Sequence, residues 1–236
     1  MSIPKKIFQT HITYEYIKNN PILFDAVKSW QKPNYEYLFY DDNDCDIFMK
    51  TYFDDKTYEA YNKCILPVMK ADLWRYCIIY IYGGIYADTD TILNTNPCIF
   101  TNHKKLLVIT PENDYHFCQW VFSAPPKSPI LKEIIKLCTE RLLNFTYPSN
   151  EHFVHYLTGP ALFTEGIHSY LNSINTTIDK CDDLIYIFKH SSFHTKFIKH
   201  LFTGSYKHGW MQQRDNLHLK YENTNNKTIQ HVEIQI

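Results

Sequence analysis

Two aspartates, Asp88 and Asp90, stand two positions apart at the end of a short apolar stretch, residues 85–87. If that stretch is a strand, an extended chain points both carboxylates to the same side. Such a pair can bind Mg²⁺ or Mn²⁺, which take few protein ligands and complete their coordination with water and phosphate oxygens. The pair therefore fits a metal site for a diphosphate substrate, and its plainer alternative is a solvated turn.

The same D-x-D spacing occurs twice more, in the acidic run that contains Asp42, Asp44 and Asp46. This run precedes an apolar segment, which is the pattern of a helix N-cap with an acidic first turn. A calcium-binding EF-hand loop starting at Asp42 would need glycine at its sixth position and an acid at its twelfth. The chain has Ile47 and Phe53 there, so we expect a helix start and no calcium site.

A long apolar segment, residues 67–82, is predicted to be one buried helix. A proline opens it and two glycines follow it, as is typical of helix ends. Apolar side chains occur around its whole circumference, yet it carries Asp72 and Arg75, three positions apart and therefore on one face. Unpaired buried charge is very costly. The two residues either form a structural ion pair or reach a polar cavity beside Asp88, where they would bind a sugar or its diphosphate.

The segment 200–210 combines two histidines, a lysine and a tryptophan with two glycines, and is predicted to be a mobile functional loop. A neutral imidazole of His200 or His208 could complete the metal coordination, and Lys207 could neutralise a phosphate. Trp210 could cover the site and exclude water. For each of these residues taken alone, the alternative is an ordinary surface loop.

The chain as a whole alternates predicted strands with predicted helices. Strands are expected over residues 5–9, 35–40, 85–87, 105–110, 117–123 and 183–188, with further helices starting at Pro21 and spanning 129–143 and 160–172. This order predicts an α/β sheet with helices on both faces and ligands at the carboxyl ends of its strands. We expect one domain over residues 1–215 and a polar tail, 216–236, that could add an edge strand.

Composition narrows the classes of function. The 236 residues carry 24 Lys and Arg against 25 Asp and Glu, a net charge of -1, which argues against a nucleic-acid partner. The seven cysteines are scattered and never form a C-x-x-C pair, so neither a disulfide framework nor a thiolate zinc site is expected. No secretory signal or membrane-spanning segment is recognisable, and we expect a cytoplasmic protein.

Several segments together resemble a known enzyme family. They are IPKKIFQT near the N-terminus, PVMKADLWR at 67–75, GGIYADTD at 83–90, Thr-Gly-Pro at 158–160 and HLFTGSY at 200–206. With them the chain resembles glycosyltransferase family 32. This DXD sugar-binding group includes yeast α-1,6-mannosyltransferases and capsule-type bacterial enzymes, and is related to the catalytic domains of large clostridial toxins. The resemblance covers residues 3 to about 210.

The resemblance implies a GT-A fold and a retaining, metal-dependent transfer of a hexose from a UDP- or GDP-sugar to a hydroxyl of a glycan, lipid or protein. It implies that Asp90 binds the metal, Mn²⁺ or Mg²⁺, and that His200 supplies a further ligand or phosphate contact. Asp88, the first aspartate of the motif, would contact the metal and the donor's ribose and sugar. Asp72 and Arg75 would hold the donor sugar.

The same resemblance places Gln9 and Thr10 next to the nucleoside. With Lys207 and Trp210 from the predicted loop, they complete the expected donor site. Two alternatives remain open at this point. The chain could be a non-catalytic module that binds a sugar or nucleotide, or a nucleotide-sugar hydrolase with the same donor site.

Overall fold

A computed structural model describes residues 2–145, 152–190 and 193–203. Within these residues, six strands form one mixed sheet in the order β2-β1-β3-β6-β5-β7. They are β1 (Lys6–Thr10), β2 (Glu36–Tyr40), β3 (Gly84–Ala87), β5 (Leu107–Ile109), β6 (Val121–Ala124) and β7 (Ile185–Ile187). β1 runs parallel to β2 and β3, and β5 parallel to β7, whereas β6 is antiparallel to β3 and β5. The predicted mixed α/β sheet is confirmed.

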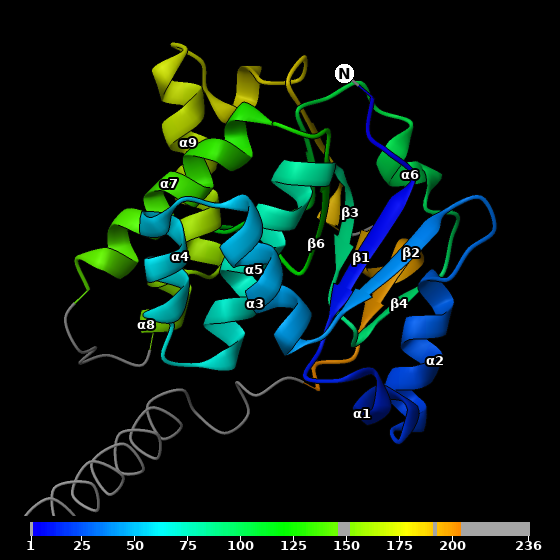
Figure 1. Cartoon of the computed structure of the whole chain (residues 1–236). Coiled ribbons are helices and arrows are strands. Elements are labelled where there is room, and N and C mark those ends of the chain that lie inside the picture. Colours follow the sequence, from blue (N-terminus) through cyan, green and yellow to red (C-terminus); the bar gives the residue numbers. More distant parts are fainter. Residues whose placement is uncertain (1, 146–151, 191–192, 204–236) are drawn as a thin grey trace, which may run out of the picture.

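Helices flank this sheet on both sides (Figure 1). On one side lie α3 (Asp42–Tyr52), α4 (Asp55–Asn62), α5 (Pro67–Tyr82), α7 (Pro129–Leu143), α8 (Phe153–Leu157) and α9 (Pro160–Ser173). On the other side lie α2 (Pro21–Trp30), with α1 (Tyr14–Lys18) beside it, and α6 (Cys98–Thr101). A small antiparallel sheet of β4 (Thr91–Leu93) and β8 (Ile198–His200) contacts α2. The short helical turns are η1 (Ile178–Lys180) and η2 (Phe193–Phe197).

Alternation along the strands builds a hydrophobic core on each face of the sheet. Ile7 and Ile85 belong to the core that contains Trp30 of α2. Their neighbours Phe8 and Tyr86 belong to the larger core around α5. Because consecutive side chains of a strand point to opposite faces, β1 and β3 each contribute to both cores. Both strands are therefore fixed between two packed layers, and their carboxyl ends are fixed with them.

The helix predicted over residues 67–82 is confirmed as α5. It is buried on most of its circumference, and even its charged residues Asp72 and Arg75 are only 1% and 4% exposed. It ends before Gly83, which has a positive φ of 65°, a conformation that glycine adopts at helix C-termini at little cost. A tight corner then leads from α5 directly into β3.

Several local predictions differ from the structure. β6 begins at Val121, four residues after the predicted strand start, because the preceding residues bond elsewhere. The Phe117 N–H donates to Thr164 Oγ1 at 2.8 Å, and Gln119 Nε2 donates to Asp72 Oδ1 at 3.1 Å. The short helices α1, α4 and α8 were not predicted, because eight residues or fewer carry little periodic signal.

His200, predicted to begin a mobile loop, is instead the last residue of β8. This part of the prediction is wrong because residues 198–200 pair with β4, with His200 opposite Thr91. Lys207, His208, Trp210 and the tail 216–236 lie outside the described residues.

All seven cysteines are free, and six of them are buried, in agreement with the expectation that they form no disulfide framework. In the part of the chain that the structure describes, no helix is both long enough and apolar enough to cross a membrane.

Gly84 is a position where the fold tolerates no side chain. Its φ is 116°, and an added Cβ would lie 2.7 Å from the Lys6 carbonyl oxygen of the neighbouring strand. We predict that Gly84→Ala lowers the free energy of unfolding by about 2–3 kcal/mol, through backbone strain and displacement of β1. Urea unfolding followed by circular dichroism measures this. Lys50→Ala on the exposed side of α3 is the control, expected within about 0.5 kcal/mol of wild type. An equally small effect of Gly84→Ala would contradict the strain.

Candidate active site

The D-x-D motif follows β3, where the chain turns instead of continuing extended. The Asp88 N–H donates to the Trp120 carbonyl oxygen at 2.8 Å, and Thr91 N–H donates back to the Asp88 carbonyl oxygen at 3.2 Å. Thr91 Oγ1 adds a second bond to that oxygen at 2.6 Å. The prediction of extended geometry at Asp88 and Asp90 is wrong because these bonds close a turn. The two carboxylates nevertheless approach each other.

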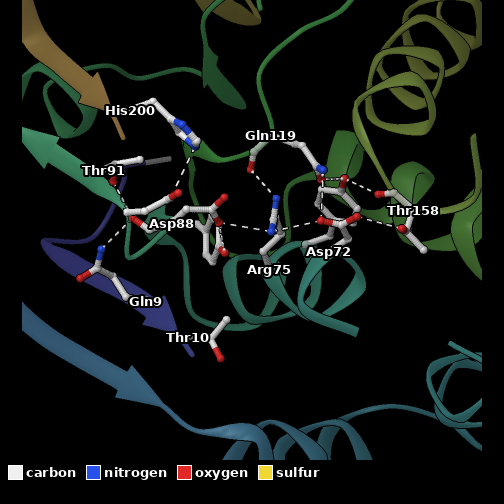
Figure 2. Close-up of polar contacts among 12 residues, drawn as sticks. Gln9, Thr10, Asp72, Arg75, Asp88, Thr91, Gln119, Thr158 and His200 are labelled. Carbon is white, nitrogen blue, oxygen red and sulfur yellow. Dashed lines mark hydrogen bonds and ion pairs between the residues drawn. The ribbon is translucent and has the colours of Figure 1, made fainter. Parts of the chain in front are cut away.

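Asp88, Asp90 and His200 converge at this turn. Figure 2 shows Asp88 and His200 on the two sides of the site. One ligand atom from each of the three lies within 4.8 Å of the others. His200 Nε2 is 3.5 Å from Asp90 Oδ1, and the Phe202 N–H donates to His200 Nδ1 at 3.1 Å. Asp90 Oδ2 accepts from both N–H and Oγ1 of Thr203, each at 3.0 Å. The pairing of β4 with β8 therefore completes the cluster with a residue distant in sequence.

Buried polar contacts support the turn from the side of β1 and α2. Gln9 is fully buried, its Nε2 donates to the Asp88 carbonyl oxygen at 3.1 Å, and its Oε1 accepts from the Tyr37 hydroxyl at 2.9 Å. Trp30 Nε1 donates to the carbonyl oxygen and Oγ1 of Thr91 at 2.9 and 3.1 Å. Gln9, placed next to the nucleoside by the resemblance, thus positions the motif. Its direct contact with a donor stays a prediction.

The guanidinium of Arg75 links two carboxylates (Figure 2). One of its terminal nitrogens lies 3.1 Å from Asp72 Oδ1 and 3.2 Å from Asp88 Oδ1. The group lies over the Tyr86 ring, 4.7 Å from its centroid, and the other terminal nitrogen donates to the Gln119 carbonyl oxygen at 3.4 Å. Burial alone lowers the pKa of Arg75, but the negative charges around it, Asp88 foremost, raise the pKa overall. Arg75 is therefore charged at all ordinary pH values.

Asp72 sits at the inner end of this network. Its Oδ2 accepts from Thr158 Oγ1 at 2.8 Å, and its Oδ1 accepts from Gln119 Nε2 at 3.1 Å. Tyr76 donates its hydroxyl to the side-chain oxygen of Gln119 and is also 2.8 Å from the Thr158 carbonyl oxygen. Burial raises the pKa of Asp72 to about 7, against the opposing effect of Arg75 and of these hydrogen bonds. The structural ion pair, one of the two alternatives for Asp72 and Arg75, is thus present.

A cavity of about 330 Å³ opens beside Thr10, at the carboxyl end of β1. Its wall combines apolar side chains with one acidic and one basic residue, and the lining residues are Thr10, Asp42, Cys45, Tyr61, Cys64, Ile65, Leu66, Pro67, Lys70 and Ala71. Thr10 Oγ1 itself donates to the Tyr40 carbonyl oxygen at 2.8 Å. The cavity lies where β1, α3 and the start of α5 meet.

Comparisons with known proteins identify the family of this chain. The family model described as "Glycosyltransferase sugar-binding region containing DXD motif" matches residues 5–113. The initiation-specific α-1,6-mannosyltransferase of Schizosaccharomyces pombe is 31% identical over 201 residues, which covers 72% of this chain and 49% of that protein. The chain belongs to this DXD glycosyltransferase family. The resemblance found in the sequence is confirmed.

A second curated relative covers this family member to a similar extent. The corresponding mannosyltransferase of Candida albicans is 25% identical over 207 residues, covering 72% of this chain and 54% of that protein. The chain thus spans about half the length of these curated relatives. Among solved structures, one titled "PaToxG Glycosyltransferase" superposes with a TM-score of 0.54 at 18% identity, over 73% of this chain and 71% of that one. The GT-A fold is confirmed.

Five residues predicted for the site of this DXD family member lie in one continuous network: Asp72, Arg75, Asp88, Asp90 and His200. Gln9 donates a hydrogen bond to the Asp88 carbonyl oxygen of that network. Thr10 lines the cavity at the carboxyl end of β1. Lys207, Trp210 and His208, the alternative to His200 as a metal ligand, are not in the described part of the chain.

Sequence reasoning missed the polar residues that hold this network. Thr158 and Thr203 belonged to the segments Thr-Gly-Pro and HLFTGSY that carry the resemblance, which was the available signal for them. Gln119 and Trp30 lie outside those segments, and lone residues of these types are typical of ordinary cores. Their supporting role became visible only through their hydrogen bonds to Asp72 and Thr91, respectively.

Thr158 allows a test of this buried network. We predict that Thr158→Val, which keeps shape but removes the hydroxyl bond to Asp72, lowers the free energy of unfolding by about 1–3 kcal/mol. Denaturant titration measures the change. Thr139→Val is the matched control, because the buried Oγ1 of Thr139 has no partner among the described residues, so its removal is expected to be neutral or slightly stabilising. Equal effects of the two variants would contradict the assigned bond.

Proposed function

We propose that the chain is a metal-dependent, retaining hexosyltransferase that moves a sugar from a nucleotide-diphosphate donor to a hydroxyl of a glycan, lipid or protein. The observation that carries this proposal is the convergence of Asp88, Asp90 and His200 beside the Arg75 ion pair. The named activities of the curated relatives support it, and suggest mannose as the transferred hexose. The cytoplasmic location expected from the sequence stays a prediction.

The three converging residues fit a hard divalent cation. They offer two carboxylates and one imidazole, a donor set suited to Mn²⁺ or Mg²⁺. Asp88 Oδ1 is engaged with Arg75 and the Tyr86 hydroxyl, whereas no hydrogen bond in the described part of the chain uses its Oδ2. His200 would bind through a ring nitrogen that has given up its proton. When bound, the cation would bind the donor's phosphates and offset the charge that develops on the leaving nucleoside diphosphate.

We assign the donor sugar to the region next to Asp72 and Arg75. Arg75 is ion-paired with Asp88, and Asp72 is ion-paired with Arg75, so a sugar linked to a diphosphate at Asp88 would lie close to both. Both residues are almost completely buried. In the absence of a donor, their ion-pair network fixes the position of the Asp88 carboxylate and keeps it charged. A site whose groups are fixed before the substrate arrives loses less entropy on binding.

The nucleoside has a suitable place in the cavity beside Thr10. A volume of about 330 Å³ is at the lower end of the range for small-molecule sites. Asp42 and Lys70 give its wall both a hydrogen-bond acceptor and a donor. In an α/β sheet, ligands bind outside the carboxyl ends of the strands, and the cavity lies at that end of β1.

Retention would follow if the acceptor attacked from the face on which the nucleoside diphosphate leaves, with a departing phosphate oxygen taking the acceptor proton. The residues Asp72 and Arg75 would hold the sugar in place during this exchange.

The same donor site in a hydrolase would pass the sugar to water, so dependence of the rate on an added acceptor separates the two activities. A non-catalytic binding module would show donor binding without turnover.

Replacement of Asp90 tests the reaction directly. We predict that Asp90→Asn lowers transfer by at least about 100-fold, because a cation ligand and its charge are lost. It should also abolish the Mn²⁺-dependent thermal stabilisation given by the donor. The assays are nucleoside diphosphate release and thermal unfolding, with GDP-mannose, UDP-glucose and UDP-galactose as donors and with Mn²⁺ or EDTA.

The control for Asp90 is Asp46→Asn, which alters another D-x-D pair of the chain. Asp46 lies in α3, where it contacts the Tyr58 hydroxyl at 3.3 Å, and its substitution should leave transfer unchanged. Full activity of Asp90→Asn would exclude the proposed function.

His200 provides a separate test of the cation site. We predict that His200→Ala raises the Mn²⁺ concentration needed for half-maximal donor stabilisation by about 10-fold or more, since one of the ligands is lost. Titration of Mn²⁺ at saturating donor, read by thermal unfolding, measures this. His168→Ala on α9 is the control. An unchanged Mn²⁺ requirement would remove His200 from the metal site and leave the two aspartates in it.

A further inference from the structure

A hairpin over residues 110–118 lies beside the candidate site. It connects β5 to β6, and the register pairs Val121 of β6 with Ala87, the last residue of β3. The hairpin therefore emerges at the end of the sheet where the D-x-D motif follows β3. The bond between the Asp88 N–H and the Trp120 carbonyl oxygen ties the two segments together.

Glu112 of this hairpin has a carboxylate oxygen with no assigned function. Its Oε2 is buried and has no hydrogen-bond partner within the described residues. Burial raises the pKa of Glu112, the negative charge of Asp88 raises it further, and the positive charge of Arg75 lowers it. Its carboxylate therefore shares the electrostatic environment of the site. A buried carboxylate oxygen without a donor is costly, and a ligand that supplies a donor would remove that cost.

The hairpin is held in place by hydrogen bonds of its own main-chain groups, and Glu112 Oε2 takes no part in them. The Glu112 N–H donates to the His116 carbonyl oxygen at 2.8 Å, and His190 Nε2 donates to the Glu112 carbonyl oxygen at 3.2 Å. His194 Nε2 bonds the Pro111 carbonyl oxygen, also at 3.2 Å. These bonds fix the backbone from which the Glu112 side chain projects, and none of them uses Glu112 Oε2.

The chemistry of a carboxylate selects its ligand. Phosphate oxygens accept hydrogen bonds and are repelled by a negative charge, whereas sugar hydroxyls donate. The three-residue cluster at the motif comprises Asp88, Asp90 and His200 and does not include Glu112. Glu112 therefore suits neither the diphosphate nor that cation cluster, and it suits a hydroxyl.

The order of the strands in the sheet indicates which substrate carries the hydroxyl that Glu112 binds. The cavity assigned to the nucleoside is at β1, the motif follows β3, and the Glu112 hairpin lies beyond β3 at β6 and β5. We propose that Glu112 binds the acceptor, accepting a hydrogen bond from an acceptor-sugar hydroxyl and thereby positioning the acceptor against the donor. This inference rests on the proposed transferase function and adds a residue to its acceptor side.

The test compares Glu112→Gln with Asp114→Asn, which removes a charge from an exposed position of the same hairpin. Transfer from the donor that stabilises the wild type is measured against methyl α-mannoside and methyl α-glucoside, with the thermal shift for donor and Mn²⁺ measured in parallel. We expect Glu112→Gln to raise the acceptor KM or lower acceptor kcat/KM by about 10- to 100-fold, as for loss of a charged hydrogen bond. Its donor KM and donor-induced thermal shift should stay within about 2-fold of wild type, and Asp114→Asn should match wild type throughout.

Three results would overturn the proposal. An acceptor KM and kcat/KM equal to wild type in Glu112→Gln would remove Glu112 from the acceptor site. An increase in the donor KM as large as that in the acceptor KM would instead assign Glu112 to the donor sugar. A wild-type protein without any metal-dependent donor stabilisation would refute the transferase function itself, and this inference with it.

Discussion

The site depends on one buried cation, the guanidinium of Arg75, between the carboxylates of Asp72 and Asp88. Without it, two negative charges would stand in a poorly solvated space and repel each other. The guanidinium can satisfy both because its nitrogens form a rigid planar fork. The face of Tyr86 covers this group, which connects the charge network to the larger hydrophobic core. Fold and site are therefore inseparable here, since the helix that fills the core also sets the charge of the D-x-D motif.

The residues around Arg75 fall into two groups with different roles. Asp88, Asp90 and His200 present ligand atoms to one small volume. Gln9, Trp30 and Thr158 present none there and instead saturate the polar groups behind them. Such supporting contacts keep side chains in one geometry, which reduces the entropy lost when a substrate is bound.

The sequence predicted the parts of this structure that have strong local signals. α5 combines a proline start, a glycine end and continuous apolar character, so its bounds and its burial followed directly. Asp72 and Arg75 stood out because charges in such a helix need partners. The pairing of β4 with β8 could not be predicted, because three-residue strands carry almost no pattern and their partners are distant in sequence. The role proposed for Glu112 could not be predicted either, because only the folded structure shows that its Oε2 is buried without a hydrogen-bond partner.

The small β4–β8 sheet has a consequence for the order in which the protein is made. Residues 91–93 leave the ribosome long before residues 198–200, yet they must pair to bring His200 to Asp90. Contacts of such large sequence separation form late, because the entropy of closing a long loop is lost first. The nascent chain can therefore build most of the large sheet while its three-residue cluster is still incomplete. The protein would then become able to bind the cation only at the end of folding.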